Sequence, residues 1–280
     1  MKPLFCFQID NKMKDNSAKD LIVKRAPRSA INRIDKACDE ENAYVMKKVS
    51  LPIAFNIIEM VLLLPAFFAL YIAYDAISKG SFEIIKDWAW IFVPGLISAI
   101  VLLIIFSVEK IRKHNYENSE RYALHQNRLD RLFDSLYMEM GVPVDAPYTD
   151  IIYFSYRVKN GEIKPEVTGK YDRQYKLWDM KVFSDKKKLY LSTDEEMYAI
   201  DLHEIKGIRK TDKAAYLSAD EKQKRRLEKF KKHNVKAGVL TGYKIQPYIL
   251  EYEHKGEDWG IYFPHYELSV FENATGLKAK

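Results

Sequence analysis

The sequence has few cysteines and lacks the short motifs that identify the commonest nucleotide-binding sites. Its 280 residues include two cysteines, Cys6 and Cys38, whose spacing fits neither a metal site nor the disulfide framework of a small secreted domain. We therefore expect both to be reduced thiols. Neither G-x-G-x-x-G nor G-x-x-x-x-G-K-S/T occurs, so the sequence contains no dinucleotide fingerprint and no P-loop.

The excess of basic over acidic residues is also small. Lys and Arg number 45 and Asp and Glu 39, which gives a net charge of +6 shared between the two ends of the chain. A nucleic-acid-binding domain normally gathers a larger excess on one face. We therefore expect no nucleic-acid partner.

A recognisable enzyme site is missing as well. The histidines are dispersed, and His203, in HEIKG, lacks the second histidine four residues later that a zinc-protease helix needs. Ser, His and Asp residues are too common for a catalytic triad to be inferred without geometry. We expect no metal, no cofactor and no enzymatic activity, with an enzyme of unrecognised site as the least favoured alternative.

What the sequence does contain is two long apolar runs, residues 51–74 and 88–108. Each is long enough to supply the roughly 20 helical residues that are needed to cross a bilayer. The second run, WAWIFVPGLISAIVLLIIFSV, carries no charge. The tryptophans at its start and Tyr71 and Tyr74 at the end of the first run would form an aromatic belt at one shared membrane interface. We predict a transmembrane helical hairpin over 51–108, in preference to two buried helices of a soluble protein.

Basic residues lie on one side of the predicted hairpin. Five of them fall just outside the two runs: Lys47, Lys48, Lys110, Arg112 and Lys113. Residues 75–87, which connect the runs, hold two lysines and three acidic residues. The positive-inside rule then predicts a multi-pass inner-membrane protein with both termini in the cytoplasm.

One carboxylate lies inside the first run. Glu59 is about 12 Å from Leu51 at roughly 1.5 Å per residue, near the bilayer midplane, and Asn56 lies one turn earlier on the same face. The second run crosses the bilayer in the opposite direction, and its residues at the same depth as Glu59 are those around Ser98. A charge there is costly, so we predict a neutral carboxyl hydrogen-bonded to Ser98, to Asn56 or to its mate in a dimer. The alternatives are a proton or ligand site, and snorkelling to the interface.

The N-terminal segment, residues 1–50, alternates between charged and short apolar stretches. A helix from about Ile31 onward would place Ile34 and Cys38 on one face. The stretch LFCFQI at residues 4–9 suggests a short strand, and the sequence does not indicate what it pairs with.

The segment after the second run, residues 109–141, contains no proline and no glycine before Gly141. We therefore predict one juxtamembrane stalk helix that ends there. Its second half has apolar residues at helical spacing: Leu129, Leu132, Phe133, Leu136, Tyr137 and Met140. This face is expected to pack on the following domain, or alternatively on a partner helix.

From Asp150 onward the hydrophobic pattern has a period of two. Short apolar segments between polar turns predict strands at DIIYFSYRV, YKLWDMKVF, LYLS, MYAIDL, EIKGIRK, YKIQPYILEYE and WGIYF. The last segment, PHYELSVFENATG, begins with Pro264 and ends at Gly276, an arrangement typical of a helix. We predict an α+β domain over 148–280, a curved antiparallel sheet or barrel of about seven strands capped by a C-terminal helix.

This order of elements resembles the pleckstrin-homology fold, in which one helix closes a corner between two nearly orthogonal sheets. The pieces that carry the resemblance are YKLWDMKVFSDKKKLYLS, YAIDLHEIKGIRK and IYFPHYELSVFENATGLK. With the hairpin, residues 51–276 are similar to bacterial membrane proteins with a pleckstrin-homology-like, YcxB-like cytoplasmic domain. The resemblance implies a binding or scaffolding fold, and it places Phe271, on the final helix, in the core as the residue that caps the barrel.

The resemblance does not extend to phosphoinositide binding. Members that bind these lipids carry paired basic residues in a basic-x-Arg pattern around the first hairpin loop, and the basic residues between 157 and 173 lack that spacing. A separate basic segment, residues 218–238, interrupts the strands as a helix or loop. We hypothesise that it docks onto anionic lipid headgroups, the alternative being a solvated basic loop. The contacting residues would be Lys222, Lys224, Arg225, Arg226, Lys229, Lys231 and Lys232.

Together these features predict a non-catalytic, membrane-anchored binding or scaffolding module. The expected partners are the lipid bilayer, anionic lipid headgroups, and a second copy of the chain or another protein. The rival interpretation is a small oligomeric membrane sensor or transport-associated subunit that signals through its spans and stalk.

Overall fold

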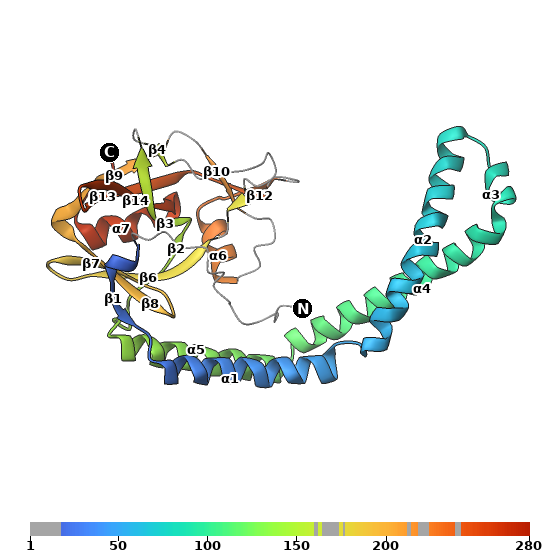
Figure 1. Cartoon of the computed structure of the whole chain (residues 1–280), viewed down its shortest axis with the longest axis horizontal. Helices are drawn as coiled ribbons and strands as arrows, with labels where there is room; N and C mark the ends of the chain where they lie inside the picture. The colour runs from blue at the N-terminus through green and yellow to red at the C-terminus, as the bar shows by residue number, and fades with distance from the viewer. Residues whose placement is uncertain are drawn as a thin grey trace. The chain divides into compact units, whose positions relative to one another are not determined.

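A computed structural model describes residues 18–159, 162–163, 174–175, 177–211, 214–217, 224–238 and 242–280. The strand predicted at residues 4–9 lies outside these residues. The chain forms two compact units, which can be followed by colour along the chain in Figure 1. Of the described residues, the first unit holds 33–132, and the second holds 18–32 together with 133–280.

The first unit is helical throughout its described residues. Its elements are α1 (Arg28–Tyr44), the π-helical turn η2 (Val45–Val49), α2 (Ile53–Lys79), α3 (Glu83–Asp87), α4 (Ala89–Glu117) and α5 (Glu120–Met140). The division between the units falls inside α1 and inside α5. The helix predicted from about Ile31 onward is therefore present as α1, and Ile34 and Cys38 are both buried on it.

Cys38 departs from the sequence-based expectation in its chemistry. It is disulfide-bonded, so the prediction of a reduced thiol is wrong for this residue. Cys6 lies outside the described residues.

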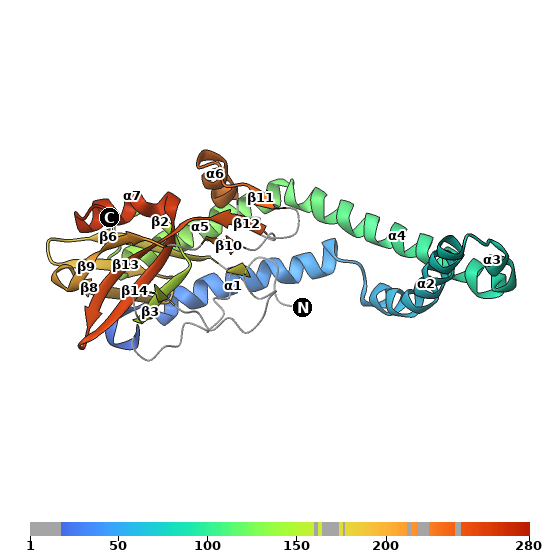
Figure 2. The ribbon, with the colours of Figure 1, turned by 90° about the horizontal axis from the view of Figure 1, so that it is seen from above.

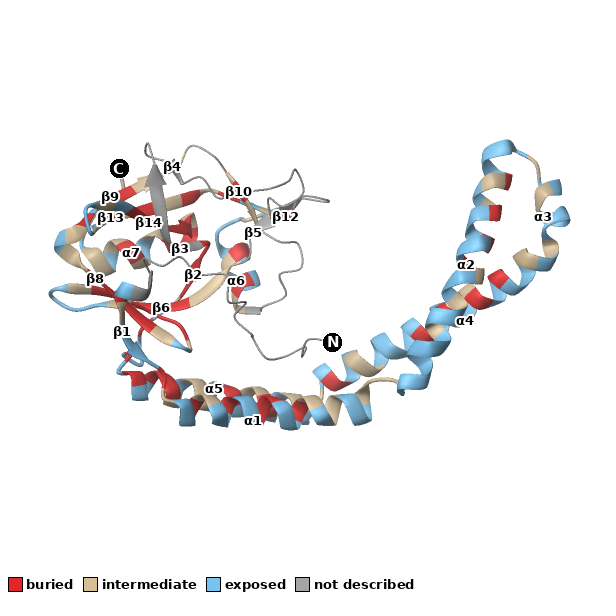
Figure 3. Cartoon of the chain, viewed as in Figure 1, coloured by how far each residue is buried: buried red, intermediate tan, exposed pale blue. Residues whose placement is uncertain are grey.

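Two helices, α2 and α4, are long and apolar enough to cross a membrane. They lie side by side as an antiparallel pair joined through α3 (Figures 1 and 2). Gly80, at a φ of 64°, ends α2 in the left-handed conformation that glycine adopts freely. Figure 3 shows exposed residues along both helices, and the most apolar windows of α2 and α4 are only 11% and 22% buried.

Small residues allow α2 and α4 to approach closely. The buried positions of the pair are Ala66, Ala69, Ile72 and Ala76 on α2, and Gly95, Ser98, Leu102, Ile105 and Tyr116 on α4. A Cβ atom at Gly95 would lie 2.3 Å from the Pro65 carbonyl oxygen and 2.6 Å from the Ala69 Cβ. Only glycine fits at this crossing, as is common where membrane helices pack tightly.

The prediction of one continuous stalk helix is wrong, because the chain breaks between α4 and α5. α4 continues past the apolar run to Glu117, and Asn118 and Ser119 interrupt the helix. The Ser119 hydroxyl accepts a hydrogen bond from the Tyr122 backbone N–H at 3.2 Å. This side-chain cap satisfies one of the free N–H groups at the start of α5 and explains why a new helix begins there.

The described residues of the second unit form three sheets. The first has the order β1–β8–β7–β6–β2, with bounds Ile22–Arg25, Glu196–Asp201, Lys188–Ser192, Trp178–Ser184 and Tyr148–Ile151. The second has the order β4–β3–β14–β13–β9, with bounds Glu162–Ile163, Tyr153–Lys159, Glu257–Pro264, Pro247–His254 and Ile205–Lys210. The third has the order β11–β12–β10–β5, with bounds Ala237–Gly238, Gly242–Ile245, Ala215–Leu217 and Gln174–Tyr175. Neighbouring strands are antiparallel apart from β5 and β10.

The two larger sheets are connected by consecutive strands. β2 pairs with β6 in the first sheet, and β3 pairs with β14 in the second. Between them, the Ile152 N–H donates to the Tyr262 carbonyl at 2.7 Å, which ties the bend to β14. Among the described residues no ladder closes these sheets into one barrel, and the strands outnumber the seven expected because several are short or interrupted.

The main core of the second unit lies between the two larger sheets and the last helix. α7 (Leu268–Thr275) places Phe271 in this core, where the side chain is fully buried and stacks on Phe263 at 4.1 Å between ring centroids. The predicted core position of Phe271 is therefore confirmed. Tyr137 of α5 packs edge-to-face on Tyr148 of β2 at 5.9 Å, so the apolar end of the stalk packs on this unit, as predicted.

Candidate functional site: the charged junction of helix α6

The densest cluster of charged side chains in the described residues surrounds α6 (Lys224–Lys232) in the second unit. Phe230 anchors this short helix, being 2% exposed in a small core with Ile249 and Tyr266. We call the ionisable residues around it the α6 junction. They are Asp150, Asp179, Arg225, Arg226, Lys229 and Glu267.

Arg226 is the centre of the α6 junction. Its Nε donates to Asp150 Oδ1 at 2.9 Å, and one terminal nitrogen donates to Asp179 Oδ1 at 2.8 Å and to the Leu177 carbonyl at 3.2 Å. Arg225 donates a second, very short hydrogen bond to Asp179. A fork of donors on a planar group lets Arg226 bridge two carboxylates, which the single ammonium of a lysine could not do equally well.

Lys229 fixes the other side of the helix. Its ammonium donates to Glu267 through a very short contact and to the Tyr148 carbonyl at 2.9 Å. Glu267 also accepts the Asp150 backbone N–H at 3.0 Å, and the Tyr266 hydroxyl donates to Asp150 Oδ2 at 3.0 Å. Every charged group of the α6 junction therefore has a protein partner of opposite charge or a hydrogen bond.

Burial and charge act against each other in the α6 junction. Burial raises the pKa of Asp150 and that of Glu267, although Arg226 and Lys229 oppose the effect. Burial also works against ionisation of Asp179, but Arg226 and Arg225 outweigh it and lower the pKa of that carboxyl. Three carboxylates and three cations balance, so the α6 junction has no surplus charge with which to bind an ionic ligand.

This arrangement changes the predicted lipid-contact surface. Arg226 is 4% exposed and cannot reach a bilayer, so the hypothesis is wrong for that residue. Arg225 and Lys229 are partly exposed and are engaged with carboxylates of their own unit. Lys231 and Lys232, in the last turn of α6, are exposed. Lys222 and the side chain of Lys224 lie outside the described part of the chain.

A second buried cation lies beside the α6 junction. Lys181 of β6 is 4% exposed, and its ammonium lies 4.9 Å from the centre of the Tyr137 ring and 4.7 Å from that of Tyr148. The cross-strand pairing of Tyr148 with Lys181 explains this position. Burial lowers the pKa of Lys181, and Asp134 opposes the shift. The two rings stabilise a desolvated ammonium by cation–π attraction and so fasten α5 to the first sheet.

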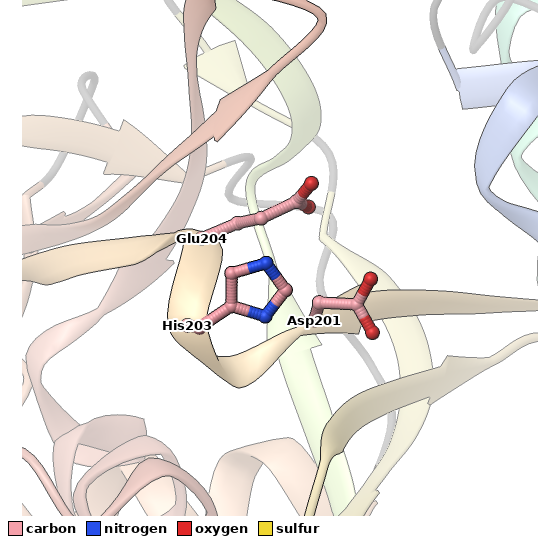
Figure 4. Close-up of side chains that lie close together, drawn as sticks. All are labelled: Asp201, His203 and Glu204. Atoms are coloured by element: carbon pink, nitrogen blue, oxygen red, sulfur yellow. The ribbon is translucent and has the colours of Figure 1, made fainter.

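Three side chains gather at the turn between β8 and β9. The ligand-type atoms of Asp201, His203 and Glu204 lie within 4.8 Å of one another (Figure 4). Lys188 lies 3.4 Å from Asp201 Oδ1, so one carboxylate of the trio already has a cation. His203 is exposed and Asp201 and Glu204 are half-buried. We assign no metal to this turn, because His203 is exposed to solvent and the Asp201 carboxylate already pairs with Lys188.

The three polar residues predicted to interact within the apolar runs do not do so. Ser98 is buried, and its hydroxyl donates to the Pro94 carbonyl of its own helix at 2.9 Å. Glu59 is half-buried and Asn56 is exposed. Among the described residues no hydrogen bond joins Glu59 to Ser98 or to Asn56, so the prediction of a contact within the chain is wrong. The predicted contact with a second copy is a separate question.

A further buried cluster, missed from the sequence, joins three helices of the first unit. Glu41 of α1 is 6% exposed and accepts a hydrogen bond from the Tyr116 hydroxyl of α4 at 2.7 Å. Arg121 of α5 donates to both oxygens of Glu41, at 3.0 and 2.9 Å, and stacks on the Tyr44 ring at 3.6 Å. His125 is buried nearby, and its Nε2 has no hydrogen-bond partner in the described part of the chain.

The sequence contained a signal for each of these clusters. Glu41 follows Ile34 and Cys38 at helical spacing, which places a carboxylate on the apolar face of α1. Asp150 stands at the start of an apolar strand, where a carboxylate needs a buried partner. The partners lie far along the chain, and no sequence pattern specifies them.

A shallow hollow of about 260 Å³ lies along one side of α5, lined by Leu124, Asn127, Arg128, Arg131 and Leu132. None of these side chains is a nucleophile or a general base, so we assign no chemistry to it. Comparisons of the chain with protein-family models, with curated proteins and with solved structures found no match.

Proposed function

We propose that the chain is a two-span integral membrane protein that holds a β-rich domain for binding or scaffolding and does not catalyse a reaction. The observation that carries this proposal is the open apolar surface of α2 and α4. Apolar core helices of a soluble protein are mostly covered, whereas about four fifths or more of these windows is not buried. In water this surface would be a very large apolar patch, and a bilayer covers it.

The proposed location is the inner membrane with both chain ends in the cytoplasm. Support comes from the basic residues that cluster where α2 begins and α4 leaves the apolar run. Arg112 of α4 donates to the Lys48 carbonyl at 2.7 Å, so these two segments are adjacent in the first unit. Positive charge at the same end of both spans favours retention of that end on the cytoplasmic side.

The proposed fold of the domain is pleckstrin-homology-like, related to the YcxB-like bacterial proteins. Its support is the connectivity: β2 lies in the first larger sheet and the next strand, β3, in the second. β6, β7 and β8 continue the first sheet, and β9, β13 and β14 complete the second. α7 then follows and inserts Phe271 between the sheets. In this interpretation β1 and the segment that carries α6 are additions to the basic fold.

The α6 junction favours binding over catalysis. Its charges neutralise one another and hold a helix against the sheets, which is an architectural role. The exposed side of α6 presents Lys231 and Lys232, which leaves them available for anionic lipid headgroups or an acidic protein surface. The domain therefore offers a scaffold that presents exposed basic residues on a fixed helix.

Membrane extraction of the full chain tests the proposal. The protein is expected to stay with membranes through alkaline carbonate washing and to be released by detergent. A fluorescent reporter at either end is expected to report from the cytoplasm. Release by carbonate alone would overturn the membrane assignment, and a terminus outside the cytoplasm would overturn the orientation.

A second candidate function is a membrane sensor that signals from its spans through the helices beside them. The observation in its favour is the cluster of Glu41, Tyr116 and Arg121, which joins α1 and α5 to the end of α4. Partner capture by crosslinking in native membranes separates the two functions. Charge reversal at Lys231 and Lys232 should change the captured partners of a binding module, and Glu41→Gln should change those of a sensor.

A further inference from the structure

The outward surface of α2 carries two polar side chains in an otherwise apolar setting. From Ile53 to Tyr74 the helix contains one carboxyl, Glu59, and one carboxamide, Asn56, which lie one turn apart. Polar groups at such a depth are costly in hydrocarbon unless they find hydrogen-bond partners. Their position therefore calls for a partner, an argument that rests on the membrane-spanning function proposed above.

Among the described residues, the partner does not come from α4, the helix that packs on α2. Gly95 of α4 lies against Pro65 and Ala69 of α2, which fixes the register of the antiparallel pair. Ser98, one turn further along α4, is therefore level with residues near 64, about 7 Å from Glu59 along the helix axis at roughly 1.5 Å per residue. Its hydroxyl is also engaged by the Pro94 carbonyl. Glu59 itself is level with residues near 103, so Ser107 lies about 6 Å away on the other side, and its hydroxyl is bonded to the Leu103 carbonyl. Neither of these two serines of α4 is therefore free to bind Glu59.

Neither side chain lies at the centre of the face that α2 packs on α4. The face of α2 that packs on α4 is occupied by buried Ala66, Ala69 and Ala76. At about 100° per residue, Glu59 lies to one side of that face and Asn56 nearly opposite it. The Glu59–Asn56 surface is therefore a second face of α2, available to another helix at the same depth.

We propose that the Glu59–Asn56 surface is the contact through which two copies of this chain associate in the membrane. Copies inserted in the same direction are related by an axis along the membrane normal, so each Glu59 meets the corresponding residue at its own depth. A carboxamide carries donors and an acceptor and a carboxyl carries acceptors, so Asn56 of one copy and Glu59 of the other are complementary. A second copy supplies the same two side chains at the same depth by symmetry.

Counting subunits of the full chain in lipid vesicles tests this inference. A C-terminal fluorescent protein and single-molecule photobleaching give the fraction of dimers at a series of protein-to-lipid ratios. Glu59→Gln keeps a hydrogen-bond acceptor at the same position, so it is expected to dimerise as the wild type does. Glu59→Leu removes the acceptor and is expected to lower the association constant by about tenfold. Leucine favours insertion, so this variant remains in the membrane.

Ser107→Ala provides the matched control. Ser107 is an exposed polar residue on α4 whose hydroxyl is bonded to the Leu103 carbonyl of its own helix at 2.7 Å, so its loss is expected to leave association unchanged. A monomeric wild type, an unchanged Glu59→Leu variant or a monomeric Glu59→Gln variant would each overturn the inference. Carbonate extraction of the same samples tests the membrane assignment separately. A protein that is monomeric but resists carbonate would overturn the dimer contact and leave the proposed function intact.

Discussion

Asp150 and Asp179 face each other directly across the β2–β6 ladder. Like charges at opposed positions of a sheet repel, and here one of the two side chains is fully buried. Arg226 resolves the conflict by donating to Oδ1 of each carboxylate, at 2.9 and 2.8 Å. The strand pairing and the docking of α6 therefore depend on each other.

Replacing Arg226 with methionine is expected to destabilise the second unit by about 3–5 kcal/mol, because it leaves two carboxylates facing each other without a buried cation. Thermal or urea unfolding of the detergent-solubilised chain, followed by circular dichroism, measures the loss. Lys232→Met removes an exposed cation from the same helix and should change stability little. Adding Asp179→Asn to Arg226→Met should recover part of the loss. No recovery would show that repulsion between the carboxylates is not its cause.

Glu41→Gln is expected to weaken the contact of α1 with α4 and α5. The substitution removes the charge that Arg121 and the Tyr116 hydroxyl share, at an expected cost of about 1–3 kcal/mol, reduced at the Arg121 side because that group is half exposed. Hydrogen exchange of α1 amides in the solubilised chain is the measurement. Glu40→Gln is the control, since Glu40 pairs with Arg128 at the surface. Equal protection in both variants would contradict the assigned role of Glu41.

The stability of the same helices should depend on pH through His125. Burial holds the pKa of His125 below its usual 6.5, an effect that Arg128 and Arg121 reinforce and Glu41 opposes. The unfolded chain therefore takes up the proton first, so stability falls as the pH drops below about 6.5 and recovers above it. Glu41 has a pKa below its usual range and stays ionised in this window.

The test of this dependence is amide exchange of α1 and α5 between about pH 5.5 and 7.5, corrected for intrinsic exchange rates. His125→Leu should remove the loss of protection at low pH, whereas His114→Leu, at an exposed position of α4, should retain it. A wild-type protein whose α1 protection is independent of pH would contradict the prediction. His265 titrates in the same sense in the second unit, so the local readout is essential.

The elements of this fold were largely predictable because they depend on local patterns. Period-two segments predicted β6, β7, β8, β9, β13 and β14, and the Pro264 to Gly276 signal predicted the helix that carries Phe271. The break at Asn118 and Ser119 was missed because a serine cap competes with helix propensity, and the outcome depends on what packs around it. Barrel closure was expected from strand order, but order alone does not determine which strand edges pair.

The candidate site was less predictable than the fold. A run of basic residues at 222–232 suggested a solvated surface, since lysines and arginines are rarely buried. Arg226 is buried because Asp150 and Asp179, at 76 and 47 residues' separation, are brought to one place by strand pairing. Charge patterns in sequence show how many cations are present. They do not show which of them meets a carboxylate after folding.

The close crossing of α2 and α4 gives the last prediction. Any side chain at Gly95 would overlap the Pro65 carbonyl oxygen, which is backbone and cannot move aside without bending α2. Gly95→Val is therefore expected to separate the two helices and to lower the melting temperature of the solubilised chain by several degrees, consistent with an overpacking cost of about 1–3 kcal/mol. Leu96→Phe adds volume at the exposed neighbouring position and serves as the control. Both variants should remain in the membrane fraction, because neither introduces charge. If Gly95→Val melts with the wild type, the hairpin does not depend on this contact, and the register used above to separate Ser98 from Glu59 would have to be abandoned.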